Sequence, residues 1–188
     1  MSQTRILVLA GSLRSASITR RIAEAAVQTA PEGVEISIYE GLGDVPFYNE
    51  DIDVAGSVPA AAERLRNAVA EADAVLLVTP EYNGTLSAVL KNAIDWVSRP
   101  YAAGAFKGKP IGVVSASISP NAARWAHGDA VKAAGIAGGV VVEAAHAYFG
   151  AIGERFGSAH PSEDAEAIAE LGASVRELVQ ASRALVTA

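Results

Sequence analysis

Cysteine is absent from the 188-residue chain, which excludes disulfide bonds, thiol catalysis and cysteine-ligated metals. Aromatic residues make up only 6%, while alanine and glycine are abundant, a balance that favours helices packed on a sheet over an all-β sandwich. No apolar run reaches the ~18 residues of a membrane span, and no signal-peptide pattern precedes the first apolar run. The net charge is −6, without a basic patch for nucleic acid or anionic membranes. We therefore expect a soluble, cytoplasmic protein.

The composition that remains is typical of a folded globular chain. Hydrophobic residues make up 51% and charged residues 19%, which excludes disorder. The length fits one domain and suffices for a sizeable core. Because no repeat, linker or low-complexity segment divides the sequence, we expect residues 1–188 to form a single domain.

Short apolar segments alternate with helical patterns along the chain. Runs such as ILVLA at 6–10 and AVLLVT at 74–79 are typical of strands buried on both faces. Alternation of this kind predicts an α/β fold, with a parallel sheet covered by helices on both sides. The predicted strands are 6–10, 34–39, 74–79, 110–115 and 139–143; the predicted helices are 19–29, 59–72, 87–97, 122–134 and 162–186, the last with a break near Gly172, and 40–57 is a long loop.

Ligands of such sheets bind beyond the carboxyl ends of the strands. After the first strand, GSLRSASITR at 11–20 gathers hydroxyl and basic side chains just before a helix. Unpaired N–H groups at a helix start favour anions, so the segment predicts a phosphate cradle, to which Arg14 adds charge. Helix capping by Ser15 or Ser17 is the alternative. The single glycine and the missing lysine exclude a dinucleotide fingerprint and a P-loop.

Two later segments follow the third and fourth strands. PEYNGTLS at 80–87 joins the turn signal Asn83-Gly84 to an aromatic ring and backbone amides, which suit a flat, polar-edged ring system, although a plain strand-to-helix turn fits equally well. SASISPN at 115–121 carries small hydroxyl residues that would let a ligand approach the backbone, but helix capping is favoured there.

Other polar residues indicate packing or solvent exposure. His127, His146 and His160 lack metal-ligand spacing and are expected to be surface or packing residues. The acids of 44–53 favour a solvated loop over a metal site, and no G-x-S-x-G elbow occurs. Trp96 and Trp125 are predicted to pack at the sheet edge or at a subunit contact.

The first two loop segments carry a family resemblance. Gly11-Ser12-Leu13-Arg14-x-x-Ser17-x-Thr19 resembles the phosphate loop of the NADPH-dependent FMN reductase family, which includes quinone, azo-dye and chromate reductases. PEYNG at 80–84, followed by LKNAIDW at 90–96, resembles the flavin loop and following helix of that family. The resemblance extends from about residue 4 to residue 180.

This resemblance implies a flavodoxin-like fold, with a three-layer, doubly wound, five-stranded parallel sheet of order 2-1-3-4-5. It also implies non-covalently bound FMN and a homodimer or dimer of dimers, in which residues 46–49 of the partner subunit add flavin contacts. The residues implied for the FMN phosphate are Ser12, Arg14, Ser17 and Thr19; those for the ring are Pro80, Glu81, Tyr82, Asn83 and Gly84; and those near its other edge are Ser115 and Ser117.

The chain departs from the family pattern in two places. Thr19 stands where asparagine is common, which retains a hydrogen-bond donor. Ser119-Pro120-Asn121-Ala122 replaces a glycine-rich stretch, so the loop expected at the ring edge is changed.

The activity that the resemblance implies is electron transfer from NAD(P)H through FMN to quinones, azo compounds, metal oxyanions or free flavin. The implied order is ping-pong, without a catalytic side chain or a metal, because the flavin carries the hydride. A flavodoxin-like FMN electron carrier is the alternative, and a sensor or scaffold without flavin is a third possibility. No nucleic-acid or membrane partner is expected.

Overall fold

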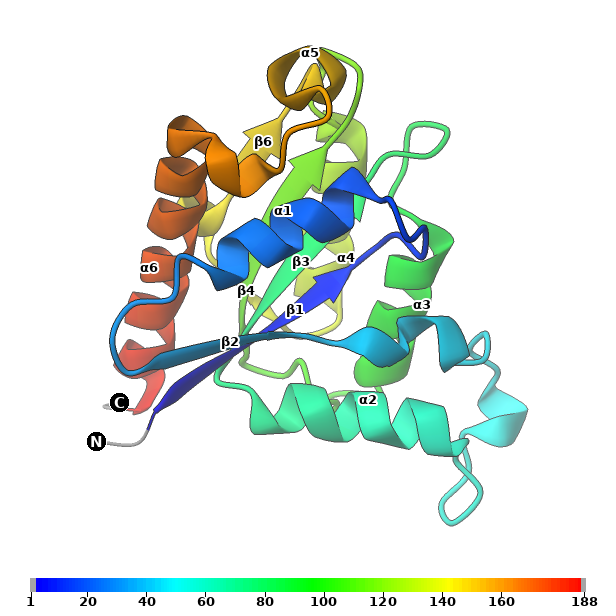
Figure 1. Cartoon of the computed structure of the whole chain (residues 1–188). Helices are drawn as coiled ribbons and strands as arrows, with labels where there is room; N and C mark the ends of the chain where they lie inside the picture. Colours follow the sequence, from blue (N-terminus) through cyan, green and yellow to red (C-terminus); the bar gives the residue numbers. More distant parts are fainter. Residues whose placement is uncertain (1–2, 187–188) are drawn as a thin grey trace.

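The computed structural model describes residues 3–186 as a parallel sheet between two layers of helices (Figure 1). The strand order is β2-β1-β3-β4-β5, and β6 also pairs with β4. This confirms the predicted flavodoxin-like order, in which the winding reverses beside β1. The strands are β1 (Thr4–Ala10), β2 (Val34–Ile38), β3 (Ala74–Pro80), β4 (Pro110–Ala116), β5 (Val140–Val141) and β6 (Ala147–Phe149).

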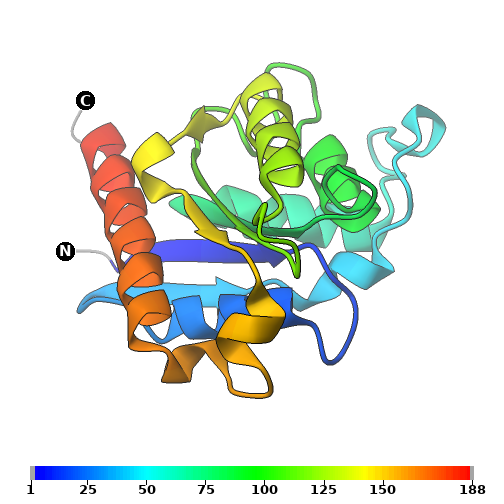
Figure 2. The same ribbon diagram turned by 90° about the horizontal axis from the view of Figure 1, so that it is seen from above.

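The helices bury both faces of the sheet. Figure 2 shows α1 on one side of β1 and α3 and α4 on the other. Side chains of β1 alternate between two cores: Ile6 and Val8 pack with α1 and α6, whereas Leu7 and Leu9 pack with α2, α3 and α4. The helices are α1 (Ile18–Val27), α2 (Ala60–Glu71), α3 (Ala88–Val97), α4 (Arg124–Ile136), α5 (Ile152–Phe156) and α6 (Ala165–Val186), and the 3₁₀ turns are η1 (Glu40–Asp44), η2 (Glu50–Ile52), η3 (Glu143–Ala145) and η4 (Pro161–Glu163).

The fifth strand, β5, is shorter than the predicted 139–143, and a sixth strand follows it. After β5 the chain forms η3, and β6, which the sequence analysis does not predict, then pairs with residues 114–116. η3 packs directly on β4, because the Ala145 carbonyl lies 3.1 Å from the point that a Cβ on Gly112 would occupy. The chain therefore leaves the sheet for one turn and returns beside β4.

The last helix starts later than the predicted residue 162 and has no break. η4 occupies the predicted first turn, and the Asp164 carboxylate then caps α6 by accepting from Ala167 N at 2.9 Å. Gly172 lies inside α6, where the Thr29 side chain comes within 3.7 Å of the point that a Cβ would occupy. That distance is an ordinary van der Waals contact, and the helix continues through Gly172 without a break. No helix in residues 3–186 combines the length and apolar character of a membrane span.

The predicted loop 40–57 is tied to α3. The Asn92 amide donates to the Pro46 carbonyl at 3.0 Å and accepts from Tyr48 N at 2.8 Å. Trp96 Nε1 donates to the same carbonyl at 2.7 Å. Trp96 is therefore a fully buried anchor for this loop, and its alternative predicted place at a subunit contact is wrong.

Candidate functional site

The loops that follow β1, β3 and β4 meet at the carboxyl end of the sheet (Figure 1). A Cβ on Gly11 would lie 2.8 Å from Ser87 Oγ and 3.0 Å from Pro80 Cδ, so the first loop passes close to the end of β3 and the start of α3. The Glu81 carboxylate accepts from Ala126 N at 3.2 Å, which joins the second loop to α4. The segments selected from the sequence therefore form one surface.

The loop after β1 presents a row of unused backbone donors. Gly11 N donates to the Val78 carbonyl at 2.8 Å, and Ser17 N donates to the Arg14 carbonyl at 3.1 Å. Between them, within the described chain, the N–H groups of residues 12–16 donate to no protein acceptor. Helix α1 begins directly after this row and adds partial positive charge. The loop is thus suited to an anion.

The four residues predicted to bind the phosphate differ in solvent exposure. Arg14 is exposed and Ser12 is half-buried, and Arg14 has no ion-pair partner among residues 3–186. Ser17 and Thr19 are only 3% and 1% exposed. Ser17 Oγ accepts from Arg20 N at 3.4 Å and caps α1, the role that the sequence analysis leaves as the alternative.

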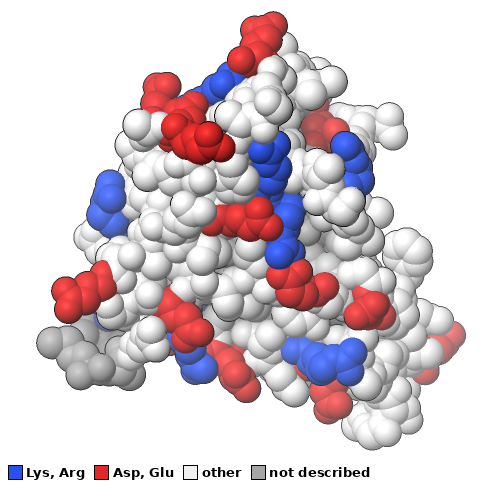
Figure 3. All heavy atoms as spheres, viewed as in Figure 1, with Lys and Arg blue, Asp and Glu red and all other residues white. Residues whose placement is uncertain are grey.

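The second arginine of this segment is already paired. Arg20 donates to Glu24 at 2.8 Å and to Glu40 through both Nη atoms, at 2.5 and 2.6 Å. These bonds lower the pKa of both carboxyl groups. The three side chains line a hollow of about 300 Å³ together with Ser12 and Arg14 of the loop. Figure 3 shows basic and acidic side chains intermixed on this face. Arg14 is therefore the cation that remains available to an anion.

The loop after β3 contains a tight two-residue turn. Tyr82 and Thr85 exchange backbone hydrogen bonds of 3.1 and 3.3 Å, and Asn83 and Gly84 between them have φ values of 53° and 76°. An Asn-Gly pair tolerates two positive φ values better than most residues. In the described chain the N–H groups of Glu81, Asn83 and Gly84 donate to no protein acceptor, and the Tyr82 side chain is exposed. The turn therefore offers donors and a ring face, while Pro80 is buried at the end of β3.

The serine hydroxyl groups at the end of β4 and in the loop after it bond within the chain. Ser115 is fully buried and donates to the Ala122 carbonyl at 2.8 Å. Ser117 Oγ accepts from Ser119 N at 3.1 Å. Asn121 Nδ2 is different, because it is buried and has no hydrogen-bond partner within residues 3–186. Asn121 is thus a candidate ligand donor that the sequence analysis places in this loop but does not single out.

The predicted packing role of the histidines fits their contacts. His127 stacks on Tyr148 with ring centroids 4.2 Å apart and meets the edge of His146 at 4.6 Å. Burial, aided by His146 and Arg124, lowers the pKa of His127 to about 3, and burial also lowers the pKa of His146. His160 caps η4. The described residues contain no group of three or more histidine, aspartate and glutamate side chains that could hold a metal.

One acid of the 44–53 segment, Asp53, is ion-paired. Asp53 accepts from both terminal nitrogens of Arg66, at 2.8 and 2.7 Å. This ion pair is mostly buried and lowers the pKa of Asp53. The carboxylate therefore anchors the loop to α2.

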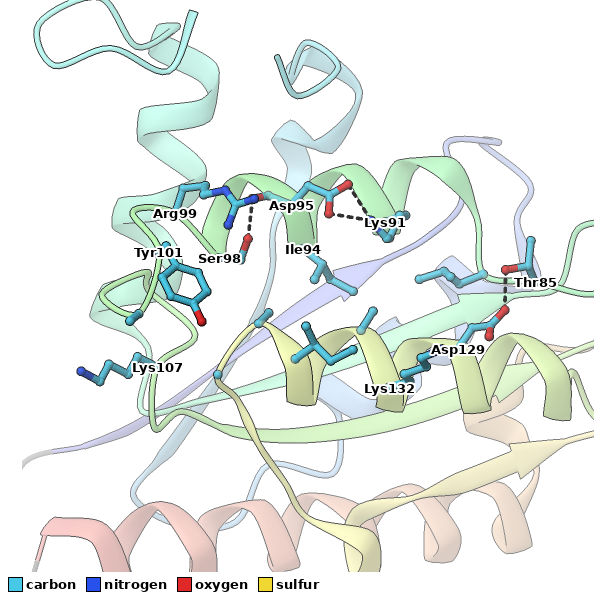
Figure 4. A pocket seen from close by; sticks show the side chains of 16 residues that line it. Thr85, Lys91, Ile94, Asp95, Ser98, Arg99, Tyr101, Lys107, Asp129 and Lys132 are labelled. Atoms are coloured by element: carbon cyan, nitrogen blue, oxygen red, sulfur yellow. Dashed lines mark hydrogen bonds and ion pairs between the residues drawn. The ribbon is translucent and has the colours of Figure 1, made fainter. Parts of the chain in front are cut away.

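A separate hollow of about 630 Å³ lies between α3 and α4 (Figure 4). Ile94 and Ile136 line it, together with the Lys91–Asp95 ion pair. Ile136 is 78% exposed. No sequence pattern described above predicts this groove. The available signal is Ile136 itself, which lies off the buried stripe of α4 formed by positions 126, 130 and 134.

Comparison with known proteins agrees with this geometry. The family model of NADPH-dependent FMN reductases matches residues 4–154. A quinone reductase of Pseudomonas putida strain KT2440 is 47% identical over 123 residues, which cover 65% of this chain and 64% of that protein. An NAD(P)H-dependent FMN reductase of Pseudomonas aeruginosa is 42% identical over 113 residues, which cover 60% of each. The chain thus spans less than two thirds of the length of either relative.

A solved structure extends the similarity to nearly the whole chain. FerB, a flavoenzyme NAD(P)H:(acceptor) oxidoreductase of Paracoccus denitrificans, has a TM-score of 0.82 and 27% identity, and the match covers 96% of this chain and 98% of FerB. The family model itself includes all three loops of the candidate site. The chain therefore belongs to the NADPH-dependent FMN reductase family, whose relatives named above are oxidoreductases.

Proposed function

We propose that this chain binds FMN non-covalently at the carboxyl end of its sheet and transfers electrons from NAD(P)H to a second acceptor. The observation that carries the proposal is the row of unused N–H groups at residues 12–16, beside Arg14 and the start of α1. A phosphate monoester carries about −1.5 to −2 charge near neutral pH. The row supplies donors and positive charge for that group without breaking an existing hydrogen bond.

The other two loops fit the flavin ring. The unused N–H groups of Glu81, Asn83 and Gly84, and the unpartnered Asn121 Nδ2, suit acceptor atoms along a ring edge. Tyr82 adds an exposed aromatic face. When bound, FMN supplies hydride acceptance and electron transfer, and the chain supplies position and electrostatics. Donors aimed at the ring edge stabilise the negative charge that develops there on reduction.

Both substrates are proposed to use the same open side of the site in turn, a ping-pong order that needs no acid–base side chain. Quinones are the acceptor class that we propose first, because the P. putida relative is a quinone reductase. Azo compounds, metal oxyanions and free flavin are further candidates. Parallel initial-rate lines support this order, whereas intersecting lines contradict it.

The binding and turnover steps are tested together by spectroscopy. The purified protein is incubated with FMN, freed of excess ligand, and mixed with NADPH without oxygen. We expect flavin absorbance bands that bleach within seconds and return when a quinone is added. Bands that persist with NADPH indicate an electron carrier, and a protein that retains no FMN contradicts the proposal.

We further propose that two copies of the chain pair through the groove between α3 and α4. The groove carries both charge signs, with Lys91 and Lys132 near Asp95 and Asp129, so a two-fold related copy can match cations with acids (Figure 4). Thr85 lines the groove and also closes the turn after β3, which makes this face continuous with the proposed FMN site.

A charged substitution at an apolar residue of the groove tests whether two copies pair through this face. We expect Ile136→Glu to shift the mass measured by light scattering from dimer to monomer. Leu185→Glu is the matched control, because Leu185 is also an exposed apolar side chain but lies on α6. An unchanged mass for Ile136→Glu contradicts the assignment of this face.

A further inference from the structure

The loop between β4 and α4 contains two adjacent residues in an uncommon backbone conformation. Ala122 and Ala123 both have a φ of 55°. Contacts of the Cβ atom disfavour this left-handed region for residues other than glycine, asparagine and aspartate. Alanine has no polar side chain to offset the cost locally, so the surrounding structure must hold both residues in place.

A buried serine makes the holding contact. Ser115 Oγ donates to the Ala122 carbonyl at 2.8 Å. His127 Nδ1 lies 3.3 Å from Ser115 Oγ. A hydroxyl has one proton, so Ser115 Oγ can only accept from His127. His127 therefore carries its proton on Nδ1, and its burial keeps the ring neutral.

The His127 ring is itself confined. Tyr148 of β6 stacks on it with an interplanar angle of 29°, and His146 meets it edge-on. The Arg124 guanidinium lies 4.4 Å from the centroid of the Tyr148 ring. Because His127 Nε2 has no partner in residues 3–186, Ser115 Oγ is the hydrogen-bonding group that orients the ring within the described chain.

We propose that Ser115 and His127 are positioning residues for the FMN site. The pair holds Ala122 and Ala123 in the left-handed region and so sets the course of residues 117–121 at the ring edge. This inference rests on the proposed function. It changes the role that the resemblance implies for Ser115 from ligand contact to support, because Ser115 is fully buried and its one proton is already donated.

A glycine at residue 122 tests whether Ser115 supports the loop or contacts FMN directly. We expect Ser115→Ala to raise the FMN Kd, measured by fluorescence titration, about tenfold, the value of one lost hydrogen bond. Glycine enters the left-handed region without a steric cost. Adding Ala122→Gly to Ser115→Ala is therefore expected to restore the Kd to within about threefold of the wild type.

Ser174→Ala is the matched control. Ser174 is buried on α6 and donates to the Ala145 carbonyl at 2.6 Å, a similar bond in a different place. We expect this variant to lower the Tm without changing the FMN Kd. Ala122→Gly is expected not to recover that loss of Tm.

Two results overturn the proposal. One is an unchanged FMN Kd in Ser115→Ala. The other is a raised Kd that Ala122→Gly does not reverse, which indicates direct contact of Ser115 with the ligand. Wild-type protein that binds no FMN contradicts the proposed function instead. The Tm values of the same variants then still test the support role, because Ala122→Gly must recover the loss in Ser115→Ala and not that in Ser174→Ala.

The histidine is tested by a conservative variant. We expect His127→Leu to weaken FMN binding to the same extent as Ser115→Ala. His127→Asn keeps an N–H donor near the position of Nδ1 and is expected to recover part of the affinity. Equal losses in the two variants contradict a hydrogen-bonding role for His127.

Discussion

The loops after β1 and β4 are both rich in serine, and both lie at the carboxyl end of the sheet, but they use their donors differently. In the first, residues 12–16 leave their N–H groups free, and Arg14 is exposed. In the second, Ser115 and Ser117 bond to the loop itself. The number of serines after a strand therefore does not distinguish a loop with free hydrogen-bond donors from a loop whose polar groups bond to one another. The path of the backbone makes that distinction.

The backbone paths explain this difference. The first loop leads directly into α1, whose cap, Ser17, turns inward. The second passes through the left-handed pair Ala122 and Ala123 before α4 begins, so its carbonyl and hydroxyl groups meet one another. Substitutions in the first loop are therefore expected to affect binding of the phosphate, and those in the second are expected to affect the shape of the loop.

The largest expected effect distinguishes Arg14 of the first loop from Arg20 of α1. Arg14→Gln is expected to raise the FMN Kd about 10- to 100-fold, because a hydrogen bond to a charged group contributes about 1.5–3 kcal/mol. The double variant Arg20→Gln, Glu40→Gln removes an ion pair without changing the net charge and is expected to change the Kd less than about threefold. Fluorescence titration measures both. Because Arg14 and Arg20 line the same hollow, a larger effect of the double variant would mean that the phosphate contacts Arg20 and not only Arg14.

Gly11→Ala tests the contact between the first loop and the start of α3. The new Cβ would lie 2.8 Å from Ser87 Oγ, and overpacking of this kind costs about 1–3 kcal/mol of unfolding free energy. Urea denaturation measures the loss. Gly128→Ala is the control, because nothing lies within 4 Å of its new Cβ on α4, and a gain of up to about 1 kcal/mol is expected there. A tolerated Gly11→Ala would show that the first loop can move.

The buried His127 of α4, which supports the second loop, gives a pH dependence of stability. The pKa of His127 is lowered to about 3 in the folded protein, so between about pH 3 and 6.5 the unfolded chain binds a proton that the folded one does not. Stability therefore rises with pH in this window, by at most about 1.4 kcal/mol per pH unit for one proton. His127→Asn should show a flatter curve by urea denaturation at several pH values. Lowered carboxyl pKa values act in both proteins and cancel, and parallel curves would contradict the buried neutral histidine.

The smallest effect is expected at Ser117. Its Oγ accepts from the exposed Ser119 N, so Ser117→Ala should change the unfolding free energy by less than about 0.5 kcal/mol. The FMN Kd should change less than about threefold. A larger loss of FMN affinity would make Ser117 a ligand contact, as the resemblance implies, and would weaken the contrast between the two loops.

Part of this molecule is predictable from local patterns. Continuous apolar runs at β1, β3 and β4 predict buried parallel strands, and the alternation with helices predicts both covering layers. β6 and α5 have three and five residues, too few for a period to appear. The start of α6 shifts to Ala165 because Asp164, and not an earlier residue, provides the capping carboxylate.

The candidate site is predictable in location but not in detail. The sequence by itself determined the order of the main strands and helices and the strands that end at the site. It also determined the serine, arginine and Asn-Gly chemistry of the site loops, because these features depend on local periodicity and turn preference. Tertiary structure alone decided that Arg20 is neutralised by Glu40, that Glu81 bonds to α4 and that Ser115 turns inward to Ala122. These hydrogen bonds join residues 7 to 45 positions apart in the sequence. A local sequence pattern does not determine which distant groups the fold brings within hydrogen-bonding distance.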